Sequence, residues 1–207
     1  MSVRRDLVVV VADKDIEQTV RGLLSRPKAL GIRQVAFDLL SHPGHDPGCY
    51  TSAHALITHY AGTHEKALVI FDLAWDGAPS REAGKLEADV CARLAPAWGE
   101  RCACVVIEPE IEAWVFSDSP NVDDALGWTG RKPDLREWLR QRGHLAAGAT
   151  KPMDPKAAFE AALRAARERS SSSIFEKLAS TVSVNRCIDP SFGRLLTVLR
   201  AWFPAVD

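Results

Sequence analysis

The sequence has no apolar run that approaches the roughly 18 residues needed to cross a bilayer, and its first residues do not pair a basic flank with a long apolar segment. We therefore expect a soluble, cytoplasmic protein with no membrane partner. Only five cysteines are present, an odd number that favours reduced thiols over a disulfide framework. A P-loop, a dinucleotide-binding glycine fingerprint and a serine or cysteine nucleophile in a recognisable setting are also missing, which argues against the nucleotide-binding and covalent-hydrolase classes that carry them.

Neither sign of charge dominates the chain. The 207 residues are 46% hydrophobic and 26% charged, with a net charge of −1, which is typical of a globular protein with a substantial core. Residues 1–120 carry 12 Lys/Arg and 17 Asp/Glu, whereas residues 121–207 carry 14 and 10. An acidic half that holds metal ions and a basic half that holds phosphates would suit a phosphodiester substrate, although two solvated surfaces would give the same counts.

Three short apolar runs each end on acidic residues. Residues 7–12 lead into Asp13 and Asp15, and residues 67–71 lead into Asp72 and Asp76. Residues 102–107 lead into three glutamates, Glu108, Glu110 and Glu112. Runs of this kind predict buried strands of a parallel sheet. Because such sheets gather ligands just beyond the carboxyl ends of their strands, we expect these acids to lie near one another.

The order of expected elements predicts an α/β fold with a parallel, doubly wound, four-stranded sheet and right-handed crossovers. A fourth strand is expected at residues 32–40, and residues 41–49, rich in Pro and Gly, are expected to form a loop. Helices are expected at 13–26, 51–61 and 81–94 between the strands, and at 111–116, 133–142, 155–169, 173–181 and 190–202 beyond them. The chain is thus divided into an α/β core, 1–120, and a helical extension, 121–207, packed together as a single compact unit.

The clustered acids have two interpretations. Carboxylate oxygens are the hard ligands that Mg²⁺ prefers, and a cation would relieve the repulsion among them. On this interpretation Asp13, Asp72 and Asp76 are metal ligands for Mg²⁺ or Mn²⁺, with Glu110 and Glu112 as further catalytic candidates. Alternatively, strand-end acids cap the helices that follow them. Spacing alone does not decide which of the three glutamates faces the site.

Other polar residues suggest further contacts. Lys14, Lys151 and Arg194 are candidate substrate-binding residues, and Lys151 is the best placed for a phosphate because it lies in a loop between turns. His42, His45, Asp46 and Cys49 have spacings that suggest zinc. Zinc sites usually need a second ligand pair, which is not evident here, so the segment is more simply interpreted as a polar loop near the acidic site.

The chain resembles the Toprim fold of topoisomerases, primases and the nucleases of overcoming-lysogenization-defect type. More narrowly, it is similar to bacterial Toprim-like proteins related to the DUF4276 and RloB groups. The motifs that carry the resemblance span nearly the whole chain: Val9-Val10-Val11-Ala12-Asp13-Lys14-Asp15, Asp46-Pro47-Gly48-Cys49, Leu68-Val69-Ile70-Phe71-Asp72, Glu108-Pro109-Glu110-Ile111-Glu112-Ala113-Trp114, Lys151-Pro152-Met153-Asp154-Pro155-Lys156, Ser191-Phe192 and Trp202-Phe203-Pro204.

This resemblance implies a Mg²⁺-dependent, nuclease-like component of a bacterial antiphage defence system, such as the methylation-associated defence system, with nucleic acid and other defence proteins as partners. The motifs also depart from the Toprim pattern. Asp13-Lys14 stands where Toprim enzymes carry a glutamate usually followed by glycine, and Asp72 and Asp76 replace an Asp-x-Asp pair. The departures suggest the alternative of a catalytically inactive Toprim-like subunit that binds a partner protein or nucleic acid in a multi-component complex.

Overall fold

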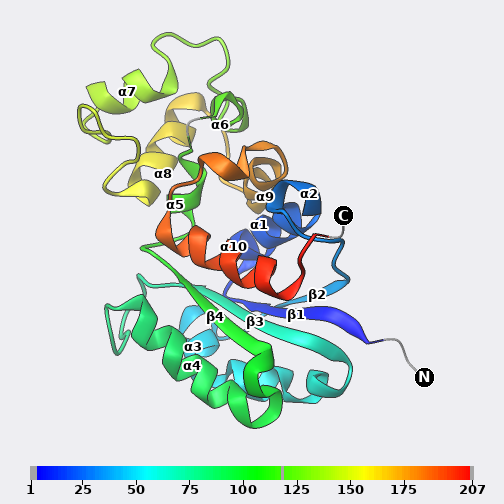
Figure 1. The fold of residues 1–207 in the computed structure, drawn as a ribbon. Coiled ribbons are helices and arrows are strands. Elements are labelled where there is room, and N and C mark those ends of the chain that lie inside the picture. Colours follow the sequence, from blue (N-terminus) through cyan, green and yellow to red (C-terminus); the bar gives the residue numbers. More distant parts are fainter. Residues whose placement is uncertain (1–3, 118, 206–207) are drawn as a thin grey trace.

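The computed structural model describes residues 4–117 and 119–205, so the outermost residues of the two expected units lie outside the described range. Its centre is an all-parallel four-stranded sheet in the order β2-β1-β3-β4 (Figure 1). The strands are β1 (Arg5–Val11), β2 (Phe37–Ser41), β3 (His64–Asp72) and β4 (Cys102–Ile107). The predicted α/β class and parallel sheet are confirmed, and the arrangement is Rossmann-like.

Helices cover both faces of the sheet. On one face lie α3 (His45–Ile57) and α4 (Ala83–Trp98), and on the other lie α1 (Lys14–Leu24) and α10 (Pro190–Trp202). The crossover from β1 to β2 uses α1, whereas those from β2 to β3 and from β3 to β4 use the opposite face. The winding direction therefore reverses between the neighbouring strands β1 and β3, the position at which doubly wound folds bind ligands.

The two central strands are apolar on both sides, as a sheet covered on both faces requires. Val8 to Val11 are fully buried, and so are the β3 residues from Val69 to Phe71. α1 turns Ile16, Val20 and Leu23 inward at helical spacing. α10 covers β4 from the C-terminal end of the chain: Phe192, Leu195 and Leu199 are buried. The last helix is thus part of the core.

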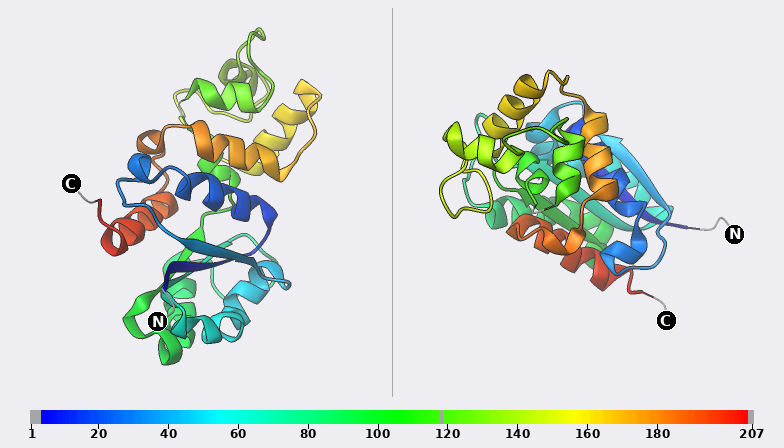
Figure 2. Two further views of the ribbon diagram at one scale, coloured as in Figure 1. Left: turned by 90° about the vertical axis from the view of Figure 1, so that its right-hand side faces the viewer. Right: turned by 90° about the horizontal axis from the view of Figure 1, so that it is seen from above.

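The segment between β4 and α10 is helical. It contains α5 (Glu112–Val115), α6 (Pro120–Ala125), α7 (Leu135–Gln141), α8 (Pro155–Ala166) and α9 (Ser172–Thr181). Figure 2 shows that α6 to α8 extend away from the sheet, whereas α9 lies along α1. We call residues 120–181 the helical lobe. Its own core includes the contacts Phe159–Phe175 and Trp128–Trp138, with ring centroids 5.2 and 4.9 Å apart.

Several predicted boundaries are wrong. The expected loop at 41–49 is half helical, because α3 already begins at His45. β2 begins at Phe37, while Ile32 forms only an isolated bridge to Pro204. α3 ends at Ile57 and is followed by the 3₁₀ turn η1 (Thr58–Gly62). Four other short elements were not predicted: α2 (Pro27–Leu30), α6, and the 3₁₀ turns η2 (Gly99–Arg101) and η3 (Val184–Arg186).

Among the described residues, we find no helix that combines the length and the apolar character required to cross a membrane.

Candidate functional site

A carboxylate follows the carboxyl end of each of the four strands. Asp13 comes after β1, Asp46 after β2, Asp72 ends β3, and Glu112 begins the short α5 after β4. Mutual charge repulsion links the four: the carboxylates of Asp46, Asp13 and Glu112 all act on that of Asp72. We call these four residues the acidic cluster. It lies at the edge of the sheet where the winding direction reverses.

Asp13 serves both interpretations made from the sequence. Its Oδ1 accepts hydrogen bonds from the backbone N–H groups of Asp15 and Ile16, each at 2.9 Å, so Asp13 is the N-cap of α1. The cap uses one carboxylate oxygen and leaves Oδ2 outside these bonds. Because capping fixes the carboxylate at the helix N-terminus, where the dipole favours negative charge, it also holds Asp13 in position within the acidic cluster.

Asp72 is the most constrained member of the cluster. Its residue exposure is 8%, and its Oδ1 is buried without a hydrogen-bond donor among the described residues. Burial raises the pKa of Asp72 well above its usual value, and the carboxylates of Asp46 and Asp13 raise it further, while the backbone N–H of Ile111 lowers it. A buried, unpaired carboxylate oxygen is energetically unfavourable, so its presence calls for a partner.

Asp46 was not predicted as a member of the acidic cluster, but the polar segment that carries it was expected near the acidic site, and its contact with Asp72 agrees with that expectation. It lies in the first turn of α3, and its Oδ1 accepts a hydrogen bond from the backbone N–H of Asp72 at 2.9 Å. Burial raises the pKa of Asp46, and the Asp72 N–H partly offsets this. Asp46 therefore holds the end of β3 in place while adding negative charge.

The preceding residue, His45, has a left-handed backbone with φ of 49°. This conformation is unfavourable for a residue with a side chain. Its Nδ1 donates to the carbonyl oxygen of Ala12 at 3.2 Å, which ties the start of α3 to the end of β1. His42 is buried, with its ring bonded to the N–H of Gly44 and beside the Ser52 hydroxyl. Both histidines thus form hydrogen bonds within the chain, which the zinc interpretation did not predict.

The structure separates the three glutamates that spacing could not distinguish. Glu112 has 7% exposure and belongs to the cluster, and burial raises its pKa to about 7. The Oε1 of Glu110 accepts a hydrogen bond from Nζ of Lys156 at 2.5 Å. Glu108 pairs with Arg194 at 2.8 Å. A single short turn thus sends three acids in three directions.

The remaining predicted site residues lie elsewhere. Asp76 is exposed in a turn, and among the described residues no hydrogen bond or ion pair joins it to the acidic cluster. Lys14 pairs with Glu17 on its own helix at 2.8 Å. Both side chains lie outside the acidic cluster, because the loop after β3 carries Asp76 outward and α1 carries Lys14 to the surface.

Two other predicted substrate contacts fasten the helices to the core. Lys151 lines an open cleft of about 250 Å³, but its ammonium group donates to the carbonyl oxygen of Ala113 at 2.7 Å and to Asp189 at 3.3 Å. Arg194 donates to the carbonyl oxygen of Val106 at 2.9 Å and to Glu87 at 3.0 Å. Arg194 thereby covers the outer edge of β4. The charged groups of Lys151 and Arg194 are thus both bound to groups of the chain itself.

Lys156 was not predicted as a site residue, but its positive charge acts on members of the acidic cluster. Besides its bond to Glu110, its ammonium group interacts electrostatically with Glu112, Asp72 and Asp15. Hydrogen bonding to Glu110 raises the pKa of Lys156 above its usual value.

The fit of these residues to a metal ion is mixed. Over residues 4–117 and 119–205, no group of three or more His, Cys, Asp or Glu side chains is arranged to hold a metal. Mg²⁺ does not need such a group, because it usually keeps several waters and binds through one or two carboxylates together with substrate phosphates. The unpaired Oδ1 of Asp72 and the second oxygen of Asp13 are donors of the right chemistry.

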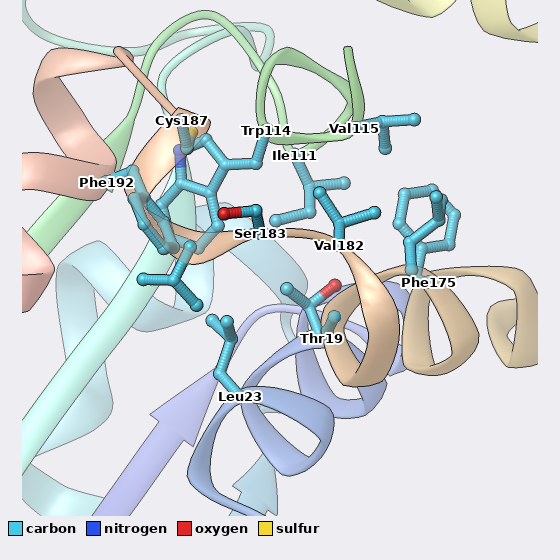
Figure 3. Close-up of a pocket in the computed structure, with 13 residues that line it drawn as sticks. Thr19, Leu23, Ile111, Trp114, Val115, Phe175, Val182, Ser183, Cys187 and Phe192 are labelled. Carbon is cyan, nitrogen blue, oxygen red and sulfur yellow. The ribbon is translucent and has the colours of Figure 1, made fainter. Parts of the chain in front are cut away.

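An apolar cavity of about 50 Å³ lies behind the site, between the core and the helical lobe (Figure 3). Its walls come from α1, α5, α9 and the start of α10, and include Leu23, Ile111, Trp114, Phe175 and Phe192. Small apolar cavities stay dry and offer little to a polar substrate. We therefore interpret it as a packing void, one wall of which, Ile111, also contributes its N–H to Asp72.

Comparison with known proteins adds no relative: no family model, curated protein or solved structure matches the chain.

Proposed function

We propose that the protein is a Toprim-like phosphodiesterase that uses a divalent cation, Mg²⁺ or Mn²⁺, to cleave nucleic acid. The observation that carries the proposal is the buried, unpaired Oδ1 of Asp72, surrounded by the carboxylates of Asp13, Asp46 and Glu112. A cation is the chemical partner that relieves both the missing hydrogen bond and the repulsion.

Each cluster residue has a distinct part in this proposal. Asp13 and Asp72, at the ends of the two central strands, would hold the cation. Asp46 keeps the end of β3 in position, and Glu112 adds charge from the β4 side. The bound ion would polarise a phosphodiester oxygen and lower the pKa of a bound water. Nucleic acid as the substrate is supported by the basic C-terminal part of the chain and by the Toprim resemblance.

A role in bacterial antiphage defence, alongside other defence proteins, rests on the sequence resemblance. One observation favours the alternative that the chain is a catalytically inactive, Toprim-like binding subunit. Lys156 lies beside the acids and supplies a positive charge from the chain itself, so the cluster is partly compensated without a metal.

The test is cleavage of single-stranded DNA, double-stranded DNA and RNA by the purified protein with Mg²⁺ or Mn²⁺. Asp72→Asn removes the central carboxylate, and Asp124→Asn is the matched control because Asp124 is exposed on α6 and paired with Lys177. We expect cation-dependent cutting that Asp72→Asn reduces at least about 100-fold, the order typical of losing one electrostatic contact at a reacting centre. Asp124→Asn should cut like the wild type.

Absence of cutting by the wild type with either ion, or cutting that survives Asp72→Asn, would refute the phosphodiesterase. Retained binding of nucleic acid without cutting would favour the binding subunit.

A further inference from the structure

Lys156 reaches the acidic cluster from a different part of the fold. It stands in the first turn of α8, where Asp154 caps the helix by accepting the N–H of Ala157 at 2.9 Å and Pro155 is buried. The backbone of this turn is therefore anchored, whereas the Lys156 side chain remains 49% exposed. From this position it spans 46 residues of sequence to contact Glu110 after β4.

The charge of Lys156 acts on acids from three strand ends. Glu110 and Glu112 follow β4, Asp72 ends β3, and Asp15 lies in the first turn of α1 after β1. The interaction lowers the free energy of the ionised carboxylates, which would otherwise repel one another in a partly buried site.

We propose that Lys156 is an internal counter-ion of the acidic cluster, and that a divalent cation binds by competing with it. The proposal rests on the metal site proposed above and adds a regulatory step to it. The Lys156 ammonium group also interacts electrostatically with Asp72, whose Oδ1 has no hydrogen-bond partner among the described residues, so a cation held by Asp72 would lie in the field of the ammonium group.

The competition is physically reasonable because the lysine is easily displaced. An ion pair between partly exposed side chains contributes little to stability, and the flexible lysine stem can swing into water. A divalent ion and an ammonium group attracted by the same carboxylates repel each other. Because Lys156 belongs to α8, displacement would release a contact that joins the helical lobe to the strand ends.

The experiment measures Mn²⁺ affinity directly, by electron paramagnetic resonance of free Mn²⁺ and by calorimetry, without a nucleic acid substrate. Lys156→Gln removes the charge and keeps a similar length, and Lys156→Arg keeps the charge. Lys85→Gln is the matched control, because Lys85 forms an exposed pair with Glu82 at 2.8 Å on α4. Circular dichroism verifies that each variant is folded.

We expect Lys156→Gln to bind Mn²⁺ about tenfold more tightly than the wild type, the order expected for removing one nearby like charge at a partly exposed site. Lys156→Arg and Lys85→Gln should bind like the wild type. Added NaCl should reduce the difference in Mn²⁺ affinity between Lys156→Gln and the wild type, because salt screens the repulsion between Mn²⁺ and the Lys156 ammonium group.

Unchanged or weaker Mn²⁺ binding by Lys156→Gln, with normal binding by the wild type, would overturn the counter-ion role and leave the metal site intact. Failure of both proteins to bind Mn²⁺ would overturn the metal site and the competition together. The two failures are thus distinguishable.

Discussion

Replacing Asp72 by asparagine should make the protein more stable in the absence of divalent cations. The substitution keeps the size of the side chain and removes the charge that burial and three neighbouring carboxylates disfavour. The new amide group also supplies an N–H donor in a place where the surrounding groups are acceptors. A functional carboxylate is expected to behave in this way: it lowers the stability of the folded protein but lies at the centre of the site.

The size of the effect can be judged from Glu112. Burial raises its pKa from 4.5 to about 7, which corresponds to at most about 3 kcal/mol of unfavourable ionisation in the folded protein. The pKa of Asp72 is raised by the same cause, burial, and its Oδ1 is a buried acceptor without a donor among the described residues. Removing such a group is worth about 2 kcal/mol, so we expect Asp72→Asn to add about that amount to the free energy of unfolding at pH 8. For a chain of this length that is a rise in Tm of roughly 4–8 °C.

The effect has a defined dependence on pH. Because the pKa of Asp72 is higher in the folded than in the unfolded protein, its contribution to stability is fully present below the ordinary value of 3.8 and is lost as the pH rises through the folded pKa. The stabilisation by Asp72→Asn should therefore be near zero at about pH 3 and greatest at alkaline pH.

Urea unfolding at several pH values in EDTA measures the pH-dependent stabilisation by Asp72→Asn. Thermal unfolding with increasing Mg²⁺ then measures how much the cation stabilises each protein. At 100 times its dissociation constant, a cation that binds only the folded protein adds about 2.7 kcal/mol. The wild type should show such a gain and Asp72→Asn should not. Asp76→Asn should match the wild type in both assays, because Asp76 is exposed outside the cluster. An Asp72→Asn protein that is less stable in EDTA at pH 8, or that keeps the Mg²⁺ response, would refute this reasoning.

Two further predictions concern the scaffold. Gly22→Ala should lower the free energy of unfolding by about 1–3 kcal/mol in urea denaturation, because a Cβ there would lie 2.7 Å from Cβ of Ala179 and 2.9 Å from a backbone carbonyl of α9. Gly84→Ala on α4, with nothing within 4 Å, should be neutral or stabilising, and equal effects of the two changes would contradict the packing argument. The pKa of the Cys91 thiol is lowered to about 7, first by the hydrogen bond from Cys102, so its alkylation by iodoacetamide should be half-maximal near pH 7. Cys102→Ala should move that midpoint toward the ordinary value of 9, and an unmoved midpoint would exclude the Cys102 contact as the cause.

Local sequence determined the sheet and the delivery of acids to its edge. Short apolar runs bounded by acids are typical of buried strands in a sheet that helices cover on both faces, so residues 7–12, 67–71 and 102–107 predicted β1, β3 and β4 within a few residues. Asp13 and Asp72 were placed beside each other by the same logic, because neighbouring parallel strands bring their carboxyl ends together. The capping role of Asp13 was equally readable from its position before a helix.

Tertiary structure decided which polar side chains meet. The Pro- and Gly-rich segment before α3 predicted a loop, yet the Ala12 carbonyl and the Asp72 N–H draw His45 and Asp46 into a helical first turn. Such long-range hydrogen bonds have no local signal. The direction of each glutamate after β4 depends likewise on partners elsewhere, Lys156 on α8 and Arg194 on α10.

Lys151 and Lys156 differ in a way that the sequence alone did not predict. Both lie in the same Lys-Pro-rich segment, and the loop position favoured Lys151. In the folded chain the Ala113 carbonyl and Asp189 bind Lys151, whereas the first turn of α8 points Lys156 toward the acids. Sequence alone determined that the protein carries carboxylates at the edge of a parallel sheet. Only the packing of the helical lobe decided which cation faces them, because that contact joins residues 46 positions apart.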